Sequence, residues 1–257
     1  MDLGLNGRAA LVLGSTSGLG RAVGEALAGE GARVAFCGRR AALARETAAA
    51  HEEAVGIETD LTDADSVRAA LASAERELGP VDVLVLNSGG PPPGRAEDLT
   101  AEALTAAFTS MLLRQVELVN AVLPGMRARG WGRIVGIGSS GVQAPIPGLA
   151  LSNTLRGGLA GYLKTLAGEV AGDGVTVNMV LPGRIDTDRV ASLDRAAADR
   201  QRLDVDVVRE RSQALIPVGR YGRPEEFAAA VTFLCGNPAS YITGEQLRCD
   251  GGLVAGY

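Results

Sequence analysis

Short apolar runs alternate with long alanine-rich stretches along this chain, and no other feature constrains its fold as strongly. The apolar runs are continuous, as in strands buried on both faces, and the stretches between them are long enough for helical crossovers. This pattern is typical of an α/β protein with a doubly wound parallel sheet and helices on both faces. We predict about seven strands, at residues 9–13, 33–37, 55–58, 81–86, 133–138, 175–181 and 246–249.

The stretches between these runs predict helices at residues 19–29, 41–51, 63–78, 101–126, 151–171 and 224–234. No linker, repeat or low-complexity segment divides the chain, so we expect one domain over residues 1–257. Residues 184–217 are dense in arginine and aspartate. They have two interpretations, a solvated helical pair or a substrate lid over the carboxyl ends of the strands.

Composition excludes several classes of site. The chain has a single histidine, His51, and three cysteines without metal-ligand spacing, so we expect no metal site, histidine triad or disulfide scaffold. A net charge of -5 without a basic cluster argues against nucleic acid as a partner. No apolar run reaches the roughly 18–20 residues of a membrane span, and the N-terminus does not read as a signal peptide. We expect a cytoplasmic protein with a small-molecule substrate.

A glycine-rich turn follows the first predicted strand and opens the first helix. Such glycines allow the backbone to approach a pyrophosphate, which then lies at the helix N-terminus. At the first strand–helix junction of an alternating chain, this turn predicts dinucleotide binding. The candidate contacts are Gly14, Thr16, Ser17, Gly18, Leu19 and Gly20.

The residues after the second strand distinguish the two nicotinamide cofactors. A carboxylate there would bind the ribose hydroxyls of NAD(H), whereas arginine suits the 2′-phosphate of NADP(H). The sequence has Arg39 and Arg40 and no acid. NADP(H) is therefore favoured over NAD(H), with Arg39 as the phosphate partner and Arg40 as a surface alternative.

The chain resembles the short-chain dehydrogenase/reductase family along nearly its whole length. The resemblance rests on the 14–20 turn, Asp60-Leu61, the Asn87–Gly90 turn, Ser139 and the segment from Pro182 to Thr187. It implies a Rossmann-like fold and a homo-oligomer, a dimer or tetramer, formed through helices 101–126 and 151–171. It also implies further cofactor contacts at Asp60, Leu61, Asn87, Gly89, Pro182, Gly183, Ile185 and Thr187.

The family's catalytic Tyr-x-x-x-Lys pair is absent from this sequence. The single lysine, Lys164, has Ala160 four residues before it. Alignment with the family pattern places the tyrosine position at Ser152 and the lysine position at Arg156. The resemblance retains the family serine at Ser139, and the family asparagine position falls on Met111.

These substitutions remove the usual proton donor, because an aliphatic hydroxyl is a far weaker acid than a phenol. Arginine keeps a positive charge but does not relay a proton. We predict an NADP-dependent oxidoreductase that acts on a small-molecule carbonyl or alcohol with a non-standard proton donor, with Ser139, Ser152 and Arg156 as catalytic residues. Two alternatives remain, a non-redox catalyst (isomerase, cyclase or elimination) and a catalytically silent NADP-binding protein.

Arg184 lies next to the expected nicotinamide position. It would either bind a carboxylate or phosphate of the substrate or form a surface ion pair with Asp186 or Asp188.

Overall fold

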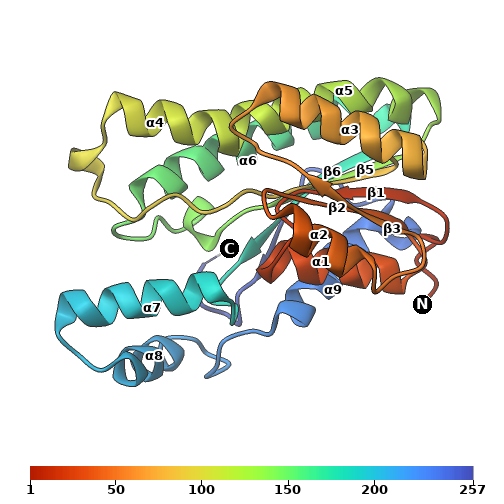
Figure 1. The fold of residues 1–257 in the computed structure, drawn as a ribbon. Coiled ribbons are helices and arrows are strands. Elements are labelled where there is room, and N and C mark those ends of the chain that lie inside the picture. The colour runs from red at the N-terminus through yellow and green to blue at the C-terminus, as the bar shows by residue number, and fades with distance from the viewer. Residues whose placement is uncertain (257) are drawn as a thin grey trace.

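The computed structural model describes residues 1–256, and its centre is a seven-stranded parallel sheet with the order β3-β2-β1-β4-β5-β6-β7 (Figure 1). The predicted fold class is confirmed, and each predicted strand is present within a few residues. The strands are β1 (Ala9–Val12), β2 (Arg33–Gly38), β3 (Ala54–Glu58), β4 (Val83–Leu86), β5 (Gly132–Ile137), β6 (Val175–Pro182) and β7 (Gln246–Cys249).

Helices cover both faces of the sheet (Figure 1). One layer holds α1 (Gly18–Gly29), α2 (Ala41–Ala48) and α9 (Pro224–Cys235). The other holds α3 (Ala64–Leu78), α4 (Ala101–Phe108), α5 (Arg114–Ala128) and α6 (Ala150–Val170). The predicted charged segment forms α7 (Asp188–Gln201) and α8 (Val205–Ala214), which extend away from the sheet beyond the end of β6. No helix within residues 1–256 is long and apolar enough to cross a membrane.

The continuous apolar runs become strands because both of their faces are buried. Leu11 and Leu84 point into a core shared with α3, α5 and α6. Their neighbours Val12 and Val85 point into the opposite core, which is shared with α1 and α9. A polar residue at any of these positions would have to be buried without water, so both faces of the strands must be apolar.

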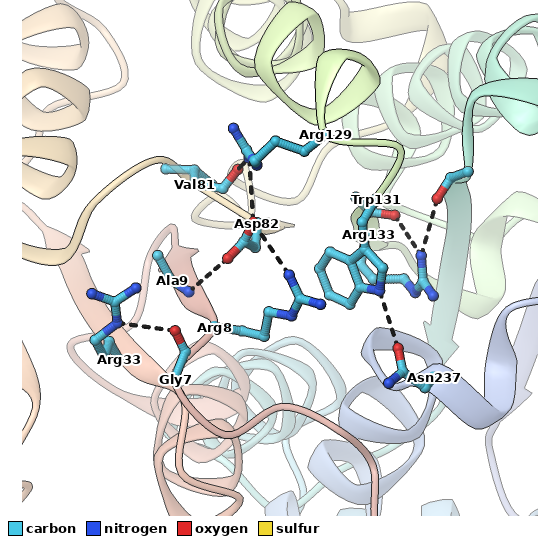
Figure 2. Close-up of polar contacts among 12 residues, drawn as sticks. Gly7, Arg8, Ala9, Arg33, Val81, Asp82, Arg129, Trp131, Arg133 and Asn237 are labelled. Carbon is cyan, nitrogen blue, oxygen red and sulfur yellow. Dashed lines mark hydrogen bonds and ion pairs between the residues drawn. The ribbon is translucent and has the colours of Figure 1, made fainter.

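The amino-terminal edge of the sheet is fixed by a polar cluster around Asp82 and Trp131 (Figure 2). The Asp82 carboxylate accepts from the Ala9 N–H at 3.3 Å and lies 3.3 Å from Nη2 of Arg129. The guanidinium of Arg8 stacks on the Trp131 ring, 3.9 Å from its centroid. Because these contacts join β1 to the segments preceding β4 and β5, they fix the register of the three central strands at the edge opposite their carboxyl ends.

The predicted helix 101–126 is not continuous. A π-helical turn, Thr109–Leu113, separates α4 from α5. A π-turn inserts one extra residue and leaves a backbone carbonyl without its usual partner. The Gln115 amide satisfies this need by donating to the Met111 carbonyl at 2.9 Å. The apolar pattern could not reveal this, because an insertion of one residue hardly changes it.

The packing of α1 on β2 can be tested at Gly24. A Cβ added there would lie 2.4 Å from Cε1 of Phe36, whereas one added at Gly29 would meet nothing within 4 Å. Overpacking costs about 1–3 kcal/mol, and the helix preference of alanine offsets at most about 1 kcal/mol. Gly24→Ala should therefore lower the free energy of unfolding by ~1–2 kcal/mol, as measured by urea denaturation. The matched variant Gly29→Ala should be neutral or slightly stabilising, and equal stability of both variants would contradict the packing.

Candidate active site

A cavity of about 1390 Å³ opens at the carboxyl ends of the strands. Loops that follow β1, β2, β3, β4, β5 and β6 line it, together with α7. Parallel pairing brings these loops to one edge although they are far apart in sequence. Every candidate residue from the sequence except Gly20 lines this cavity: Gly14, Thr16, Ser17, Gly18, Leu19, Arg39, Asp60, Leu61, Asn87, Gly89, Ser139, Ser152, Arg156, Pro182, Gly183, Ile185 and Thr187.

The turn between β1 and α1 has the backbone that an anion site requires. Gly14 and Gly18 adopt φ values of +58° and +55°, which favour glycine. Gly20 lies beneath the turn, where an added Cβ would be 2.3 Å from the Gly14 carbonyl oxygen. Ser17 does not cap α1 with its side chain. The first N–H groups of α1 are therefore free to bind a phosphate at the positive end of the helix.

Asn87 connects the turn to the neighbouring strand. Its Nδ2 donates to the Gly14 carbonyl at 3.2 Å, so the end of β4 holds the turn in place. An added Cβ at Gly14 would come within 2.8 Å of the same nitrogen. Asn87 therefore has a structural role in this structure in addition to its place on the cavity wall.

At the far end of the cavity, the structure adds Arg40 to the residues found from the sequence. Nη2 of Arg40 donates to Oγ1 of Thr16 at 2.9 Å and to Oγ of Ser17 at 2.7 Å. The guanidinium therefore lies against the glycine-rich turn, and Arg39 also lines the cavity. From the sequence, Arg40 is expected only as a surface alternative to Arg39. Its side-chain direction is set by contacts with Thr16 and Ser17, which lie 24 and 23 positions earlier.

Asp60 lies near the two arginines. Its Oδ1 accepts from the backbone N–H of Thr62 at 2.9 Å and from the Thr62 hydroxyl at 2.8 Å. These hydrogen bonds hold the pKa of the carboxyl below its usual value, with a smaller contribution from the charge of Arg39. Asp60 is thus an ionised acceptor at neutral pH.

At the other end, α6 presents Ser152 and Arg156 on one face, each 9% exposed. Nη1 of Arg156 donates to the Ile137 carbonyl at 2.5 Å, which ties the helix to the end of β5. Ser139 follows that strand, and its Oγ accepts from the Gly141 N–H at 3.1 Å. Because that bond uses a lone pair, the Ser139 hydroxyl proton is still available for another acceptor.

Arg156 remains a cation at neutral pH. Burial, and secondly the positive charge of Arg189, lower the pKa of its guanidinium to about 10. That value is still well above 7, so the cavity contains a fixed positive charge beside two hydroxyl groups. Met111, at the π-turn, closes the same region with an apolar side chain that is 3% exposed.

The tyrosines that the structure describes do not line the cavity. Tyr162, Tyr221 and Tyr241 are absent from its walls, and Tyr257 lies outside the described residues. Nζ of Lys164 donates to the Gly244 carbonyl at 2.8 Å, in a different part of the molecule.

Arg184 forms an ion pair, but with a partner that the sequence did not indicate. Its Nη1 lies 2.9 Å from Oδ1 of Asp194, which is 2% exposed, and neither Asp186 nor Asp188 pairs with it. Asp194 lies nearly two turns into α7, and its side chain reaches Arg184 in the loop that precedes this helix. Its other oxygen accepts from the Tyr221 hydroxyl at 2.9 Å. The expectation of an ion pair is right and the expected partners are wrong.

Residues 14–254 match a family model described as enoyl-(acyl carrier protein) reductase. A putative ketoacyl reductase of Streptomyces coelicolor is 35% identical over 251 residues, 95% of this chain and 96% of the relative. The structure of L-sorbose reductase from Gluconobacter frateurii, complexed with NADPH and L-sorbose, is 28% identical with a TM-score of 0.93 and full coverage of both chains. Actinorhodin polyketide ketoreductase with NADPH is 34% identical with a TM-score of 0.90, covering 96% of this chain and 97% of that one.

The geometry predicts that Arg40 discriminates between the two cofactors. Arg40→Ala should weaken NADP⁺ binding about 10–100-fold, the usual value of a charged hydrogen bond, and leave NAD⁺ binding unchanged. Isothermal titration with both dinucleotides measures this, and Arg39→Ala compares the two arginines. Arg45→Ala, on α2 and outside the cavity, is the matched control. Equal weakening of NADP⁺ and NAD⁺ would show that Arg40 supports the turn and does not bind the 2′-phosphate.

Proposed function

The chain belongs to the short-chain dehydrogenase/reductase family, and on this premise we propose that it is an NADPH-dependent reductase of a small-molecule carbonyl with a non-standard proton donor. Oxidoreductase activity of this general type is supported by the relatives and by the NADPH-bound neighbours. One observation carries the finer proposal: the phosphate-binding turn, Arg40, Ser139, Ser152 and Arg156 all line a single cavity.

The cavity fits NADP(H). The uncapped start of α1 and the turn at Gly14–Gly20 would hold the pyrophosphate, and Arg39 and Arg40 the 2′-phosphate. We assign the adenine to Asp60 and Leu61, the ribose to Asn87 and Gly89, and the nicotinamide end to Pro182, Gly183, Ile185 and Thr187. NADPH supplies the hydride when it is bound.

Ser139, Ser152 and Arg156 act on the carbonyl oxygen of the substrate. Negative charge develops on this oxygen as the carbonyl carbon is reduced. The two hydroxyl groups donate hydrogen bonds to it, and the guanidinium offsets its charge. Hydrogen bonds with the backbones of Gly141 and Ile137 fix Ser139 and Arg156 before the reaction, so these two groups need little reorganisation.

The proton comes from water in the cavity. Neither serine is acidic enough to act as a general acid, and Arg156 stays protonated because its pKa is about 10. No tyrosine of residues 1–256 lies on the cavity wall, so we assign the proton to solvent. Met111, at the position of the family's asparagine, has no amide group with which to bind this water.

Residues 184–217 act as the lid. Ser212 and Leu215 line the cavity, and Leu215 is 75% exposed. Nη2 of Arg209 lies 2.7 Å from Oδ2 of Asp186, which joins α8 to the loop after β6. We propose that closure of this segment buries Leu215 over the substrate and excludes bulk water.

We also propose that copies of the chain assemble into a dimer or tetramer. Leu104 and Phe108 on α4 are 38% and 41% exposed, which leaves an apolar surface on the layer that contains α4 and α6. Sedimentation velocity gives the oligomeric state directly.

The reductase proposal is tested by NADPH oxidation against a panel of ketones and aldehydes. Ser139→Ala and Ser152→Ala should each lower kcat about 10²-fold or more, the usual loss of an oxyanion donor. Ser240→Ala, exposed and outside the cavity, should have no effect. Product from NADPH deuterated at C4 should carry one deuterium. NADPH binding with no turnover of any carbonyl would instead favour a non-redox catalyst or a silent NADP-binding protein.

Restoring the family pair tests the proton donor. The double variant Ser152→Tyr/Arg156→Lys should raise kcat by about 10²-fold or more, because general acid catalysis contributes ~10²–10⁴-fold. NADP⁺ titration and circular dichroism confirm that the variant is folded and loaded. Tyr257→Phe should leave the parent activity unchanged. A folded, NADP⁺-binding double variant that is no faster than the parent would contradict the assignment of Ser152 to the tyrosine position.

A further inference from the structure

Most arginines on the cavity wall have an evident role. Arg39 and Arg40 lie at the end assigned to the 2′-phosphate, and Arg184 is neutralised by the buried carboxylate of Asp194 at 2.9 Å. Arg189 has no role in the steps above, and Arg156, which we assign to the carbonyl oxygen, is the other cation on the wall. Neither forms an ion pair with a carboxylate within residues 1–256.

Arg189 is held at the mouth of the cavity by backbone contacts. It lies in the first turn of α7, and its Nη2 donates to the Pro91 carbonyl at 2.7 Å, across 98 positions of sequence. Its guanidinium packs over Gly90, where an added Cβ would lie 3.0 Å from Nε and Nη2. Within residues 1–256 only one of its five N–H groups has a hydrogen-bond partner, so the others can bind a ligand.

Arg156 lies deeper and is also incompletely paired. It is 91% buried, and its one hydrogen bond uses Nη1. Two carboxylates reach the cavity wall: Asp60 is engaged by Thr62 near the adenine position, and Asp188 is exposed beside Arg189 without contacting either guanidinium. The part of the cavity around Ser139 and Ser152 therefore contains two positive charges that repel each other and that no carboxylate within residues 1–256 neutralises.

A cavity of this kind is complementary to an anion. We propose that the substrate carries a carboxylate next to its reactive carbonyl, as in a 2-oxo acid, and that Arg189 and Arg156 bind it. This inference rests on the proposed function, because it assigns the substrate class of the same site. The planar guanidinium of Arg189 takes the carboxylate at the mouth, and Arg156 faces the carbonyl oxygen and the carboxylate oxygen beside it.

The competing occupant is a phosphate of the cofactor. The turn at Gly14–Gly20 and Arg40 already provide donors for the three phosphates of NADP(H), whereas Arg189 is held by the Pro91 carbonyl in the loop after β4. The two possibilities differ in which ligand loses affinity when Arg189 is replaced.

A matched pair of probes tests the proposal: 2-oxo-4-phenylbutanoate and its methyl ester, which have the same ketone with and without the negative charge. The parent protein should favour the acid at least about 10-fold in kcat/KM. Arg189→Gln should lower kcat/KM for the acid about 10–100-fold and leave the ester and the KM for NADPH unchanged. Arg76→Gln, on α3 and outside both the cavity and the lid segment, should change neither.

Equal use of acid and ester by the parent would overturn the proposal, as would an equal loss for both in Arg189→Gln. A raised KM for NADPH with the substrate preference unchanged would assign Arg189 to the cofactor and also overturn it. Titration of the NADP⁺-saturated protein with the 2-oxo acid separates this inference from the reductase proposal. Binding that Arg189→Gln abolishes, without any turnover, would support the anion site and refute the reductase. Turnover of neutral ketones without binding of the 2-oxo acid would refute the anion site and support the reductase.

Discussion

Parallel pairing of β1, β4 and β5 is the constraint on which the rest of this molecule depends. It brings the loops after these strands to one edge of the sheet, where Asn87 at the end of β4 donates to Gly14 at the end of β1. The opposite edge is fixed by Asp82 and Trp131 with the arginines around them (Figure 2). The positions of the glycine-rich turn and of the proposed catalytic residues follow from this arrangement.

Charge explains the unusual composition of the site. A lysine at position 156 would be a point charge able to release a proton, whereas arginine is a cation that binds with a planar fork. Its burial beside Arg189 is unfavourable unless an anion or a developing oxyanion lies nearby. The loss of tyrosine and the presence of two unpaired guanidinium groups are thus parts of one proposed design, which stabilises negative charge on the substrate and leaves protonation to water.

Much of this could be predicted from sequence, because the signals are local. The strands follow from apolar runs, and the turn follows from glycines at 14, 18 and 20 whose conformation or close packing excludes a side chain. The features that could not be predicted depend on contacts between distant residues. Arg40 reaches Thr16, Arg184 pairs with Asp194, and Gln115 stabilises a π-turn that interrupts a continuous apolar pattern. The spacing of residues along the chain does not determine the directions of these side chains.

We propose that the protein stabilises the negative charge that develops on the carbonyl oxygen of the substrate but does not itself donate the proton. The pH dependence of kcat/KM for a neutral ketone with saturating NADPH tests it most directly. With serines and an arginine whose pKa is about 10 at the reacting oxygen, kcat/KM should show no inflection between pH 6 and pH 9. A single-proton inflection in that range, accompanied by a solvent isotope effect that disappears on replacement of one side chain, would identify a titrating donor in the protein and contradict the account.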